Sequence, residues 1–270
     1  SRRSAIIRLM RVVILGSGSS VPHPRRTSSA VWVETPEAKV LLDCAPSAIH
    51  RLPAEGCDWA GLDAIWISHF HLDHCGGLAP LLFALKYAPE TAGRTKPLRI
   101  FGPAGIGGLV TAFDGVSNYR LLEQPFPVEI IETETSEPFA IAAGLTAVTA
   151  KTPHTPESHA IHLRDAAGRT LVFTSDTGFH EPLAAFARHT DLFILECSFI
   201  RNKPVEKHLE LAEAIWLIHR AEPVRAVLTH LYPEWDATDL PTELTPCNPR
   251  CEILAAEDGL TLELGMRNDE

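Results

Sequence analysis

The stretch Ile67–Leu78, "ISHFHLDHCGGL", places three histidines and one aspartate within six consecutive positions. It overlaps the end of the apolar run "LDAIWIS" at 62–68, which has the composition of a buried strand. His69 and His71 are two residues apart, so both imidazoles can face one centre, and Asp73 and His74 can then turn toward a second. Neutral imidazoles with a carboxylate suit zinc, and also manganese or iron. The stretch therefore predicts a metal site at the end of a strand.

Three further residues of ligand type stand where predicted strands end. His154 follows "TAKTP", Asp176 follows "LVFTS" and His230 follows "AVLT". Side chains at strand ends are held by the sheet and face open loops, where α/β folds place their chemistry. No cysteine occupies these positions, which argues against a structural zinc site of the cysteine type. A solvated histidine-rich loop is the alternative for "HFHLDH", but it leaves the three other positions unexplained.

Short runs of Val, Ile and Leu predict strands along the whole chain, and helical periodicity appears between them. The predicted strands are 11–16, 29–34, 39–44, 62–69, 98–102, 126–131, 145–151, 158–164, 169–176, 191–197, 224–230 and 259–264, and the predicted helices are 46–54, 76–88, 104–113, 181–189 and 208–221. This order indicates an α/β protein in which two sheets pack face to face with helices outside. No repeat or linker divides the chain, so we expect one domain over 10–270. Residues 1–9 precede a natural-looking start at Met10 and are expected to be an upstream extension or a remnant of cloning.

The composition is that of a globular protein, with 270 residues, 45% hydrophobic and 21% charged side chains. Lys and Arg number 24 against 34 Asp and Glu, giving a net charge of -10, so a long nucleic acid is an unlikely partner by charge alone. A small substrate, or a local basic patch hidden by the totals, stays open.

The six cysteines form no CxxC pair, which favours reduced thiols. Without an apolar run of roughly 20 residues or a secretion signal, we expect a cytoplasmic location and no membrane partner.

The order "HFHLDH", His154, Asp176 and His230 resembles the signature of the metallo-β-lactamase superfamily, HxHxDH followed by His, Asp and His. The resemblance runs from "ILGSGSSVPHPRRTSSA" to "VLTHLYPEWD". It implies an αββα four-layer sandwich, with two mixed sheets flanked by helices, and a site for two divalent metal ions, zinc or manganese. The implied ligands are His69, His71 and His154 for one metal, Asp73, His74 and His230 for the other, and Asp176 as the bridge. Histidine rather than glutamate at position 71 favours the hydrolytic over the di-iron branch.

A pair of metal ions about 4 Å apart implies hydrolytic chemistry, because the ions share a water, lower its pKa and clamp the attacking and leaving oxygens. The resemblance thus implies a metal-bridging hydroxide as nucleophile. It leaves open whether the electrophile is phosphorus or a carbonyl carbon.

Two residues outside the ligand set bear on that choice. Glu196 ends the run "LFILE" and His208 opens "HLELAEA", a pair similar to one in the ribonuclease Z and cyclic-phosphodiesterase branches, where an acidic residue orients a histidine that protonates the leaving alkoxide. A sugar oxygen is a poor leaving group, so a general acid with a pKa near neutrality has a physical role. The alternative is an ordinary strand-end carboxylate and helix-start histidine. "SDTG" also resembles the phosphodiesterase branch, since Phe179 stands near where lactonases usually carry a catalytic tyrosine.

The departures from both subfamilies narrow the expected substrate. Asp176 follows His154 by 22 positions, which leaves no room for the arm with which ribonuclease Z grips transfer RNA. The turn "PHPRRTSS" contains no cysteine, unlike the zinc loop of the phosphonate-pathway cyclic phosphodiesterases. Two interpretations of 23–26 stay open, a phosphate-facing segment and a solvated loop.

We therefore expect a metal-dependent hydrolase, a phosphodiesterase of small or nucleotide-like phosphodiesters, with Asp73, His208 and Glu196 as catalytic residues. A carbonyl hydrolase (lactonase, thioesterase or β-lactamase) with the same metals is the alternative, and a catalytically idle scaffold is a third. A homodimer is expected only by analogy with the family.

Asp43 resembles the family's buried aspartate that supports the metal loop. His162 and His189 are expected to be packing or surface residues.

Overall fold

The computed structural model describes residues 9–265, and within them the chain forms two seven-stranded sheets. The first sheet has, in spatial order, β14 (Thr261–Leu264), β1 (Met10–Gly16), β2 (Ala30–Glu34), β3 (Lys39–Leu42), β4 (Ala64–Trp66), β5 (Leu98–Gly102) and β6 (Val128–Glu132). The second has β13 (Glu252–Ala255), β12 (Arg225–Thr229), β11 (Leu192–Glu196), β10 (Thr170–Phe173), β9 (His159–Asp165), β8 (Leu145–Lys151) and β7 (Phe139–Ala142). Both sheets are mixed: β3 to β6 and β10 to β13 run parallel, and the remaining neighbours run antiparallel.

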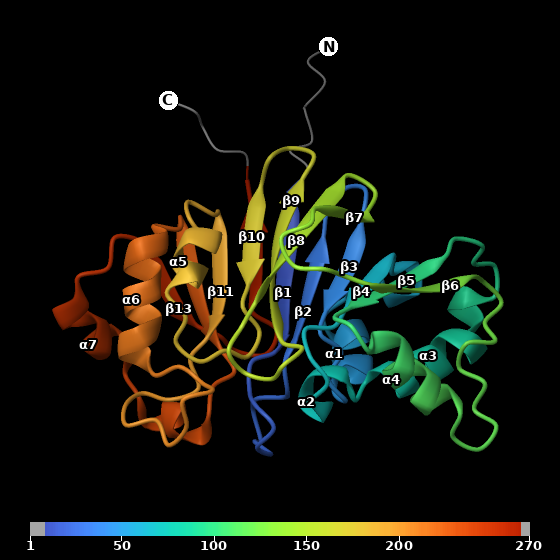
Figure 1. Cartoon of the computed structure of the whole chain (residues 1–270), viewed down its shortest axis with the longest axis horizontal. Helices are drawn as coiled ribbons and strands as arrows, with labels where there is room; N and C mark the ends of the chain where they lie inside the picture. The colour runs from blue at the N-terminus through green and yellow to red at the C-terminus, as the bar shows by residue number, and fades with distance from the viewer. Residues whose placement is uncertain (1–8, 266–270) are drawn as a thin grey trace, which may run out of the picture.

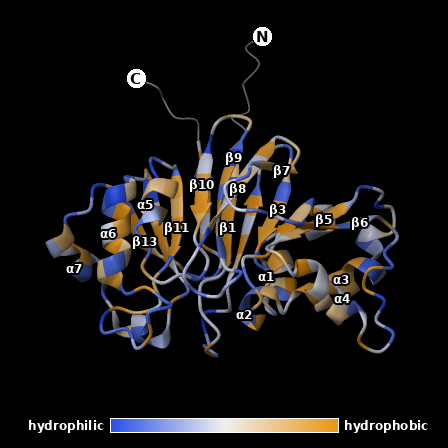
Figure 2. Cartoon of the chain, in the orientation of Figure 1, coloured by the Kyte–Doolittle hydropathy of each residue, from blue (hydrophilic) through white to orange (hydrophobic). Residues whose placement is uncertain are grey.

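The sheets pack face to face because their strands are apolar on both sides. In β1, Val12 and Ile14 join the core between the sheets, whereas Val13 and Leu15 join the core beneath the helices. This alternation follows from the two-residue period of a strand, and the near-continuous apolar sequence is what a strand buried on both faces requires. Figure 2 shows the apolar residues concentrated on the strands and on the helix surfaces that face them.

Helices cover the outer face of each sheet (Figure 1). The first sheet carries α1 (Ala48–Ala54), α2 (Leu72–Cys75), α3 (Leu78–Tyr87) and α4 (Ile106–Asp114), and the second carries α5 (Pro182–Phe186) and α6 (Leu211–Ala221), with α7 (Leu240–Leu244) beyond them. The remaining helical segments are short 3-10 turns at Trp59–Gly61, Pro89–Thr91, Pro233–Ala237 and Thr245–Cys247. These layers confirm the predicted αββα sandwich.

The main differences from the predicted elements are two missed strands, β7 and β13. Their sequences, "FAIA" and "EILA", are only four residues long and mix Phe, Ile and Leu with Ala and Glu, which strands disfavour. Each pairs with a neighbouring strand, so tertiary context decides their conformation. The strand predicted at 62–69 is shorter in the structure and comprises only β4, because the backbone leaves the sheet after Trp66 to begin the histidine-rich loop. The predicted N-terminal extension lies, apart from residue 9, outside the described residues. None of the described helices has the length and hydropathy needed to cross a membrane.

The fold predicts that the free energy of unfolding depends strongly on the large side chains between the sheets. Phe173 is fully buried in this core, whereas Phe83 is 46% exposed on α3. Replacing Phe173 by Ala should lower the free energy of unfolding by about 3–5 kcal/mol, because it leaves a cavity that the sheets cannot close. Denaturant titration followed by circular dichroism measures the change, with Phe83→Ala as the matched control. Equal effects of the two substitutions would contradict this packing.

Candidate metal centre

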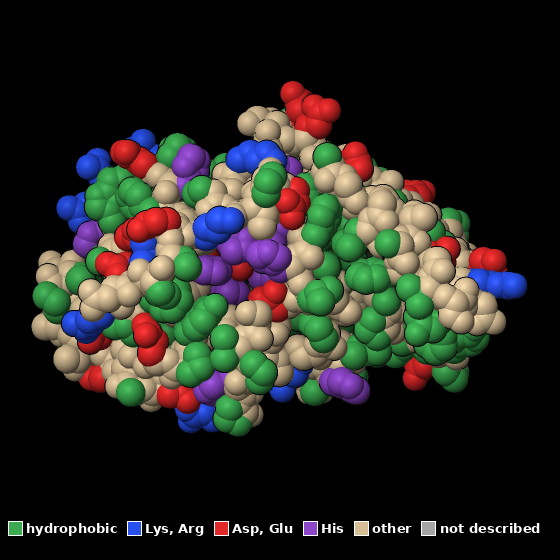
Figure 3. Space-filling view, turned by 60° about the horizontal axis from the view of Figure 1, so that its bottom comes forward, with side chains coloured by type: hydrophobic (Ala, Val, Ile, Leu, Met, Phe, Trp, Pro, Cys, Tyr) green, Lys and Arg blue, Asp and Glu red, His purple; other side chains and the backbone are tan. Residues whose placement is uncertain are grey.

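The strand ends bring the predicted ligands together at one edge of the sandwich. His69 and His71 follow β4, Asp73 and His74 lie in α2, His154 lies between β8 and β9, Asp176 follows β10, and His230 follows β12. The parallel strands β10, β11 and β12 end at the same edge, which is why residues far apart in sequence meet there. Figure 3 looks toward this edge and shows histidine side chains gathered in a hollow at its middle.

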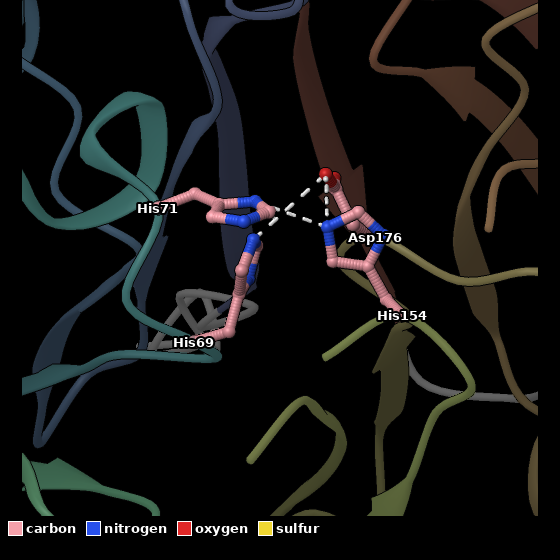
Figure 4. Close-up of side chains that lie close together, drawn as sticks. All are labelled: His69, His71, His154 and Asp176. Carbon is pink, nitrogen blue, oxygen red and sulfur yellow. Dashed lines mark hydrogen bonds and ion pairs between the residues drawn. The ribbon is translucent and has the colours of Figure 1, made fainter. Parts of the chain in front are cut away.

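The ligand-type atoms form two groups that share Asp176. The first cluster consists of His69, His71, His154 and Asp176, whose ligand atoms lie within 4.8 Å of one another. In it, His154 Nε2 lies 3.1 Å from His71 Nδ1 and 3.5 Å from Asp176 Oδ2, and His69 Nε2 lies 3.9 Å from the same oxygen (Figure 4). Four donor atoms therefore surround one small space.

The second cluster consists of Asp73, His74, Asp176 and His230, again within 4.8 Å. Asp176 Oδ1 lies 3.1 Å from His74 Nε2 and 3.3 Å from His230 Nε2. Asp73 Oδ2 lies 3.6 Å from each of these nitrogens. The two oxygens of Asp176 thus face different clusters, one each, an arrangement that suits a carboxylate shared by two cations.

Unsatisfied buried atoms indicate that these clusters suit cations. His69 Nε2, His74 Nε2, His230 Nε2 and Asp176 Oδ1 are buried, and none of them makes a hydrogen bond of good geometry within the described part of the chain. Buried polar atoms without partners are costly, so several of them converging on one place need an explanation. Divalent cations satisfy all four, and imidazole nitrogens with carboxylate oxygens are the donors that zinc and manganese accept. The residues present fit a two-metal site.

Two pKa shifts bear on the candidate metal centre. Burial lowers the pKa of His69 far below its ordinary value, so its imidazole is neutral and has a lone pair to donate. Burial alone would raise the pKa of the Asp176 carboxyl, but the neighbouring His230 and His74 outweigh it and hold that pKa well below its usual range. The position shared by the two clusters therefore carries a negative charge.

Asp43 orients the metal loop, as the sequence indicates. It is fully buried at the end of β3 and accepts hydrogen bonds from His74 Nδ1 at 2.7 Å and from the Ser68 amide at 2.8 Å. The hydroxyls of Ser68 and Ser175 donate to its Oδ2 at 2.9 and 3.0 Å. Because His74 donates through Nδ1, its Nε2 is left to face the second cluster, which fixes the tautomer that a metal needs.

The backbone at the site is strained. Asp43, Ser175 and His230 have positive φ angles of 56°, 50° and 59°. Non-glycine residues rarely adopt this conformation, and it costs of order 1–3 kcal/mol for each one. Asp43 and His230 follow their strands directly and turn their side chains back toward the clusters. Ser175, two residues after the end of β10, turns the side chain of the next residue, Asp176, in the same way. The sheets supply the rigidity that holds these turns.

Glu196 and His208 meet beside the second cluster. Glu196 is fully buried at the end of β11, and its Oε1 accepts from His208 Nδ1 at 2.9 Å and from the Thr177 amide at 2.7 Å. The His208 ring stacks on the His230 ring, with centroids 5.3 Å apart and planes 15° apart. Burial lowers the pKa of His208, but the hydrogen bond and charge of Glu196 outweigh burial and raise that pKa above the ordinary value. His208 is therefore held at the metal clusters in a form that can carry a proton.

The structure adds supporting residues that the sequence analysis missed. Ser198 Oγ lies 2.8 Å from Glu196 Oε2 and 2.9 Å from His230 Nδ1, so it links the two groups. Lys203 is nearly buried and donates to the His208 carbonyl at 3.2 Å and to Glu213 at 2.8 Å, which anchors the loop before α6. The only sequence signal for Ser198 is its place two residues after a strand-end glutamate, and Lys203 gives none.

The segment 23–26 does not lie free. His23 Nε2 and Arg25 Nη2 lie 2.9 and 2.7 Å from Asp236 Oδ2, and Arg26 also pairs with this carboxylate. Asp236 stands in the 3-10 turn that follows His230, so the cluster fastens the N-terminal loop to the segment behind the second cluster. This contact favours a structural role over an open phosphate-facing one.

Comparison with known proteins agrees with this geometry. The family model "Anti-Pycsar protein Apyc1" matches residues 10–239. The chain belongs to this family. It is 28% identical over 245 residues to ribonuclease Z of Mycobacterium bovis, covering 83% of this chain and 87% of that protein. It is 25% identical over 228 residues to the probable metallo-hydrolase YhfI of Bacillus subtilis, covering 82% and 87%.

Solved structures show the same fold. The structure of YhfI from Bacillus subtilis, described as a metallo-β-lactamase fold protein, has a TM-score of 0.80 at 23% identity and covers 95% of this chain and 99% of its own. A diphosphatase from the PhnP family has a TM-score of 0.71 at 22% identity, covering 96% and 100%. This member of the Apyc1 family is thus a metal-dependent hydrolase of the metallo-β-lactamase fold, in the branch that includes ribonuclease Z.

The hydrogen bonds of Asp43 predict a loss of metal affinity on substitution. In Asp43→Asn the amide nitrogen cannot accept from His74 or the two serines, so the His74 ring loses its fixed orientation. Zinc affinity of the purified protein should fall roughly 10- to 100-fold. Competition with a chromogenic chelator measures it, and Asp58→Asn, at a carboxylate 54% exposed, is the matched control. Unchanged zinc affinity in Asp43→Asn would show that this network does not orient the ligand.

Proposed function

We propose that the chain is a dinuclear metal-dependent phosphodiesterase that acts on small or nucleotide-like phosphodiesters. The observation that carries the proposal is the Glu196–His208 pair placed against His230, beside the shared carboxylate of Asp176. The proposed ligands are His69, His71 and His154 for one ion, Asp73, His74 and His230 for the other, and Asp176 for both. Zinc and manganese are the proposed metals.

When bound, the two cations would lower the pKa of a water between them and neutralise charge on the phosphate. The protein's own residues hold the ligand atoms in fixed positions. Asp176 sets the spacing of the clusters through its two oxygens, and Asp43 holds His74 in one tautomer. Asp73 is the catalytic carboxylate proposed for the second cluster. Although burial raises the pKa of Asp73, the hydrogen bond of His230 and the charge of His74 outweigh it and lower the pKa. Its ionised group can therefore orient the attacking water.

His208 is the proposed general acid. Its Nδ1–H donates to Glu196, so in the imidazolium form Nε2 carries the second proton, which is the one available for transfer. The buried carboxylate of Glu196 stabilises that form and fixes the ring plane. A sugar alkoxide needs a proton to leave, and its protonation in the transition state supplies a factor of about 10²–10⁴ in rate. Phosphodiester cleavage therefore has a role for both His208 and Glu196.

Two features support a small, nucleotide-like substrate. The interval between His154 and Asp176 contains only β9, β10 and their turns, so this part of the chain holds no projecting arm. The rings of Phe199 and Tyr232 lie 4.7 Å apart, and each is 6.3 Å from the ring of His208. Tyr232, the partly exposed one of the two, offers an aromatic ring on which the base of a nucleotide can stack.

The carbonyl hydrolase is the alternative, and the leaving group distinguishes the two. His208→Ala should lower kcat for a cyclic nucleotide by roughly 10²–10⁴, because the alkoxide then leaves unprotonated. The same variant should change hydrolysis of bis(p-nitrophenyl) phosphate little, since nitrophenolate leaves without help. His219→Ala, at an exposed histidine of α6, is the matched control.

The rates of a lactone and a β-lactam complete the comparison under the same metal loading. Faster cleavage of a carbonyl substrate than of any diester, together with a silent His208→Ala, would support the carbonyl hydrolase. Bound metal with no turnover of any ester would indicate a binding protein.

A further inference from the structure

A second cleft lies at the edge of the sandwich opposite the histidine clusters. It has a volume of about 570 Å³ and lies where the β9–β10 hairpin approaches the segment after α5 (Figure 1). Its charged and imidazole lining comprises His162, Arg164, Arg169, Arg188, His189 and Asp191. The strands β10 and β11 begin at this cleft and run to Asp176 and Glu196 at the other edge. The cleft is therefore separate from the candidate metal centre.

Strand register places two of these side chains on one face. His162 pairs with Val172 and Arg164 with Thr170 across the antiparallel β9–β10 ladder. Residues two apart on a strand share a face, and Val172 packs in the core beneath α5 and α6, so His162 and Arg164 are on this outer face. The His162 ring contacts Phe186 of α5, with centroids 5.8 Å apart. Arg188, just beyond the end of α5, also lines the cleft.

Two of the three arginines that line the cleft have no carboxylate within ion-pair distance among the described residues, although one carboxylate, that of Asp191, also lines it. Arg169 is paired with Asp165, at 2.6 Å, and Asp191 accepts from the Thr170 amide and hydroxyl at 2.7 and 2.9 Å. Within residues 9–265, neither Arg164 nor Arg188 has a carboxylate at ion-pair distance. The Arg188 side chain donates to His189 Nε2 at 3.1 Å. Two uncompensated guanidiniums in one concave site are notable in a chain whose net charge is -10.

His162 adds a neutral donor to this site. Its Nε2 is buried and has no hydrogen-bond partner among the described residues. Burial, and secondarily the charge of Arg164, lower the pKa of His162, so the ring is neutral near pH 7 and can carry its proton on Nε2. Guanidinium groups bind phosphate oxygens in a forked geometry, and a neutral N–H adds a further bond.

We propose that this cleft binds a small phosphate-bearing anion, held by Arg164 and Arg188 with His162 as an additional hydrogen-bond donor. Its volume is within the range of small-molecule sites, and a dianion matches two guanidiniums. The site is distinct from the metal centre and does not depend on the proposed function. It is also the kind of local basic patch that an acidic total charge conceals.

Histidine-selective NMR of the metal-loaded protein tests the proposal, because the His162 imidazole reports on the cleft and not on the metal centre. The protein is labelled with ¹⁵N-histidine, and the His162 signals are assigned by their loss in His162→Gln. Inorganic phosphate and pyrophosphate are then titrated at constant ionic strength and pH. We expect saturable shifts of the His162 signals. The double variant Arg164→Gln/Arg188→Gln should weaken the apparent affinity by at least about tenfold, as loss of two charge-assisted contacts requires.

The matched control is Arg120→Gln/Arg201→Gln, which removes two arginines that are each 64% exposed and do not line the cleft. It should bind both probes as the unaltered protein does. Unmoved His162 signals, non-saturating shifts, or equal weakening in the two double variants would overturn the proposal. Shifts confined to the ligand histidines would show that the probes bind only at the metal centre.

Discussion

The position of Asp176 between the two clusters is the constraint on which the site depends. One carboxylate is buried at the end of β10 with an imidazole nitrogen of each cluster within 3.5 Å of one of its oxygens. An ionised carboxylate at this depth is tolerated only if positive charge surrounds it. The imidazoles supply orientation and lone pairs, and two bound cations would supply the positive charge. The parallel order of β10, β11 and β12 follows from the same requirement, since it brings three strand ends to one edge.

The surrounding protein holds this arrangement through hydrogen bonds rather than through packing alone. Asp43 and Glu196 are fully buried carboxylates that each accept several hydrogen bonds, and each fixes one histidine, His74 or His208. Serine hydroxyls fill the remaining contacts. The left-handed backbone at three strand ends shows that local conformational energy is given up to aim these side chains, and the two-sided apolar core of the sheets compensates for it.

The sequence predicted the parts of the site that local pattern encodes. "HFHLDH" and the strand-end positions of His154, Asp176 and His230 require only strand periodicity and ligand chemistry to recognise. The Glu196–His208 contact rests on a resemblance, and the structure places the pair 2.9 Å apart. Ser198, Lys203 and the basic cleft could not be predicted, because they depend on contacts between elements whose spacing no local pattern fixes. For the same reason β7 and β13 were missed: pairing partners, not their own composition, make them strands.

The central claim is that two metal ions bind on either side of Asp176. The most direct test is anomalous X-ray diffraction from crystals grown with zinc or with manganese, recorded above and below the absorption edge. The account predicts two anomalous peaks about 3.5–4 Å apart, one ligated by His69, His71 and His154 and the other by Asp73, His74 and His230, each bonded to a different oxygen of Asp176. A single peak, or a peak held instead by Glu196, His208 and His230, would contradict it.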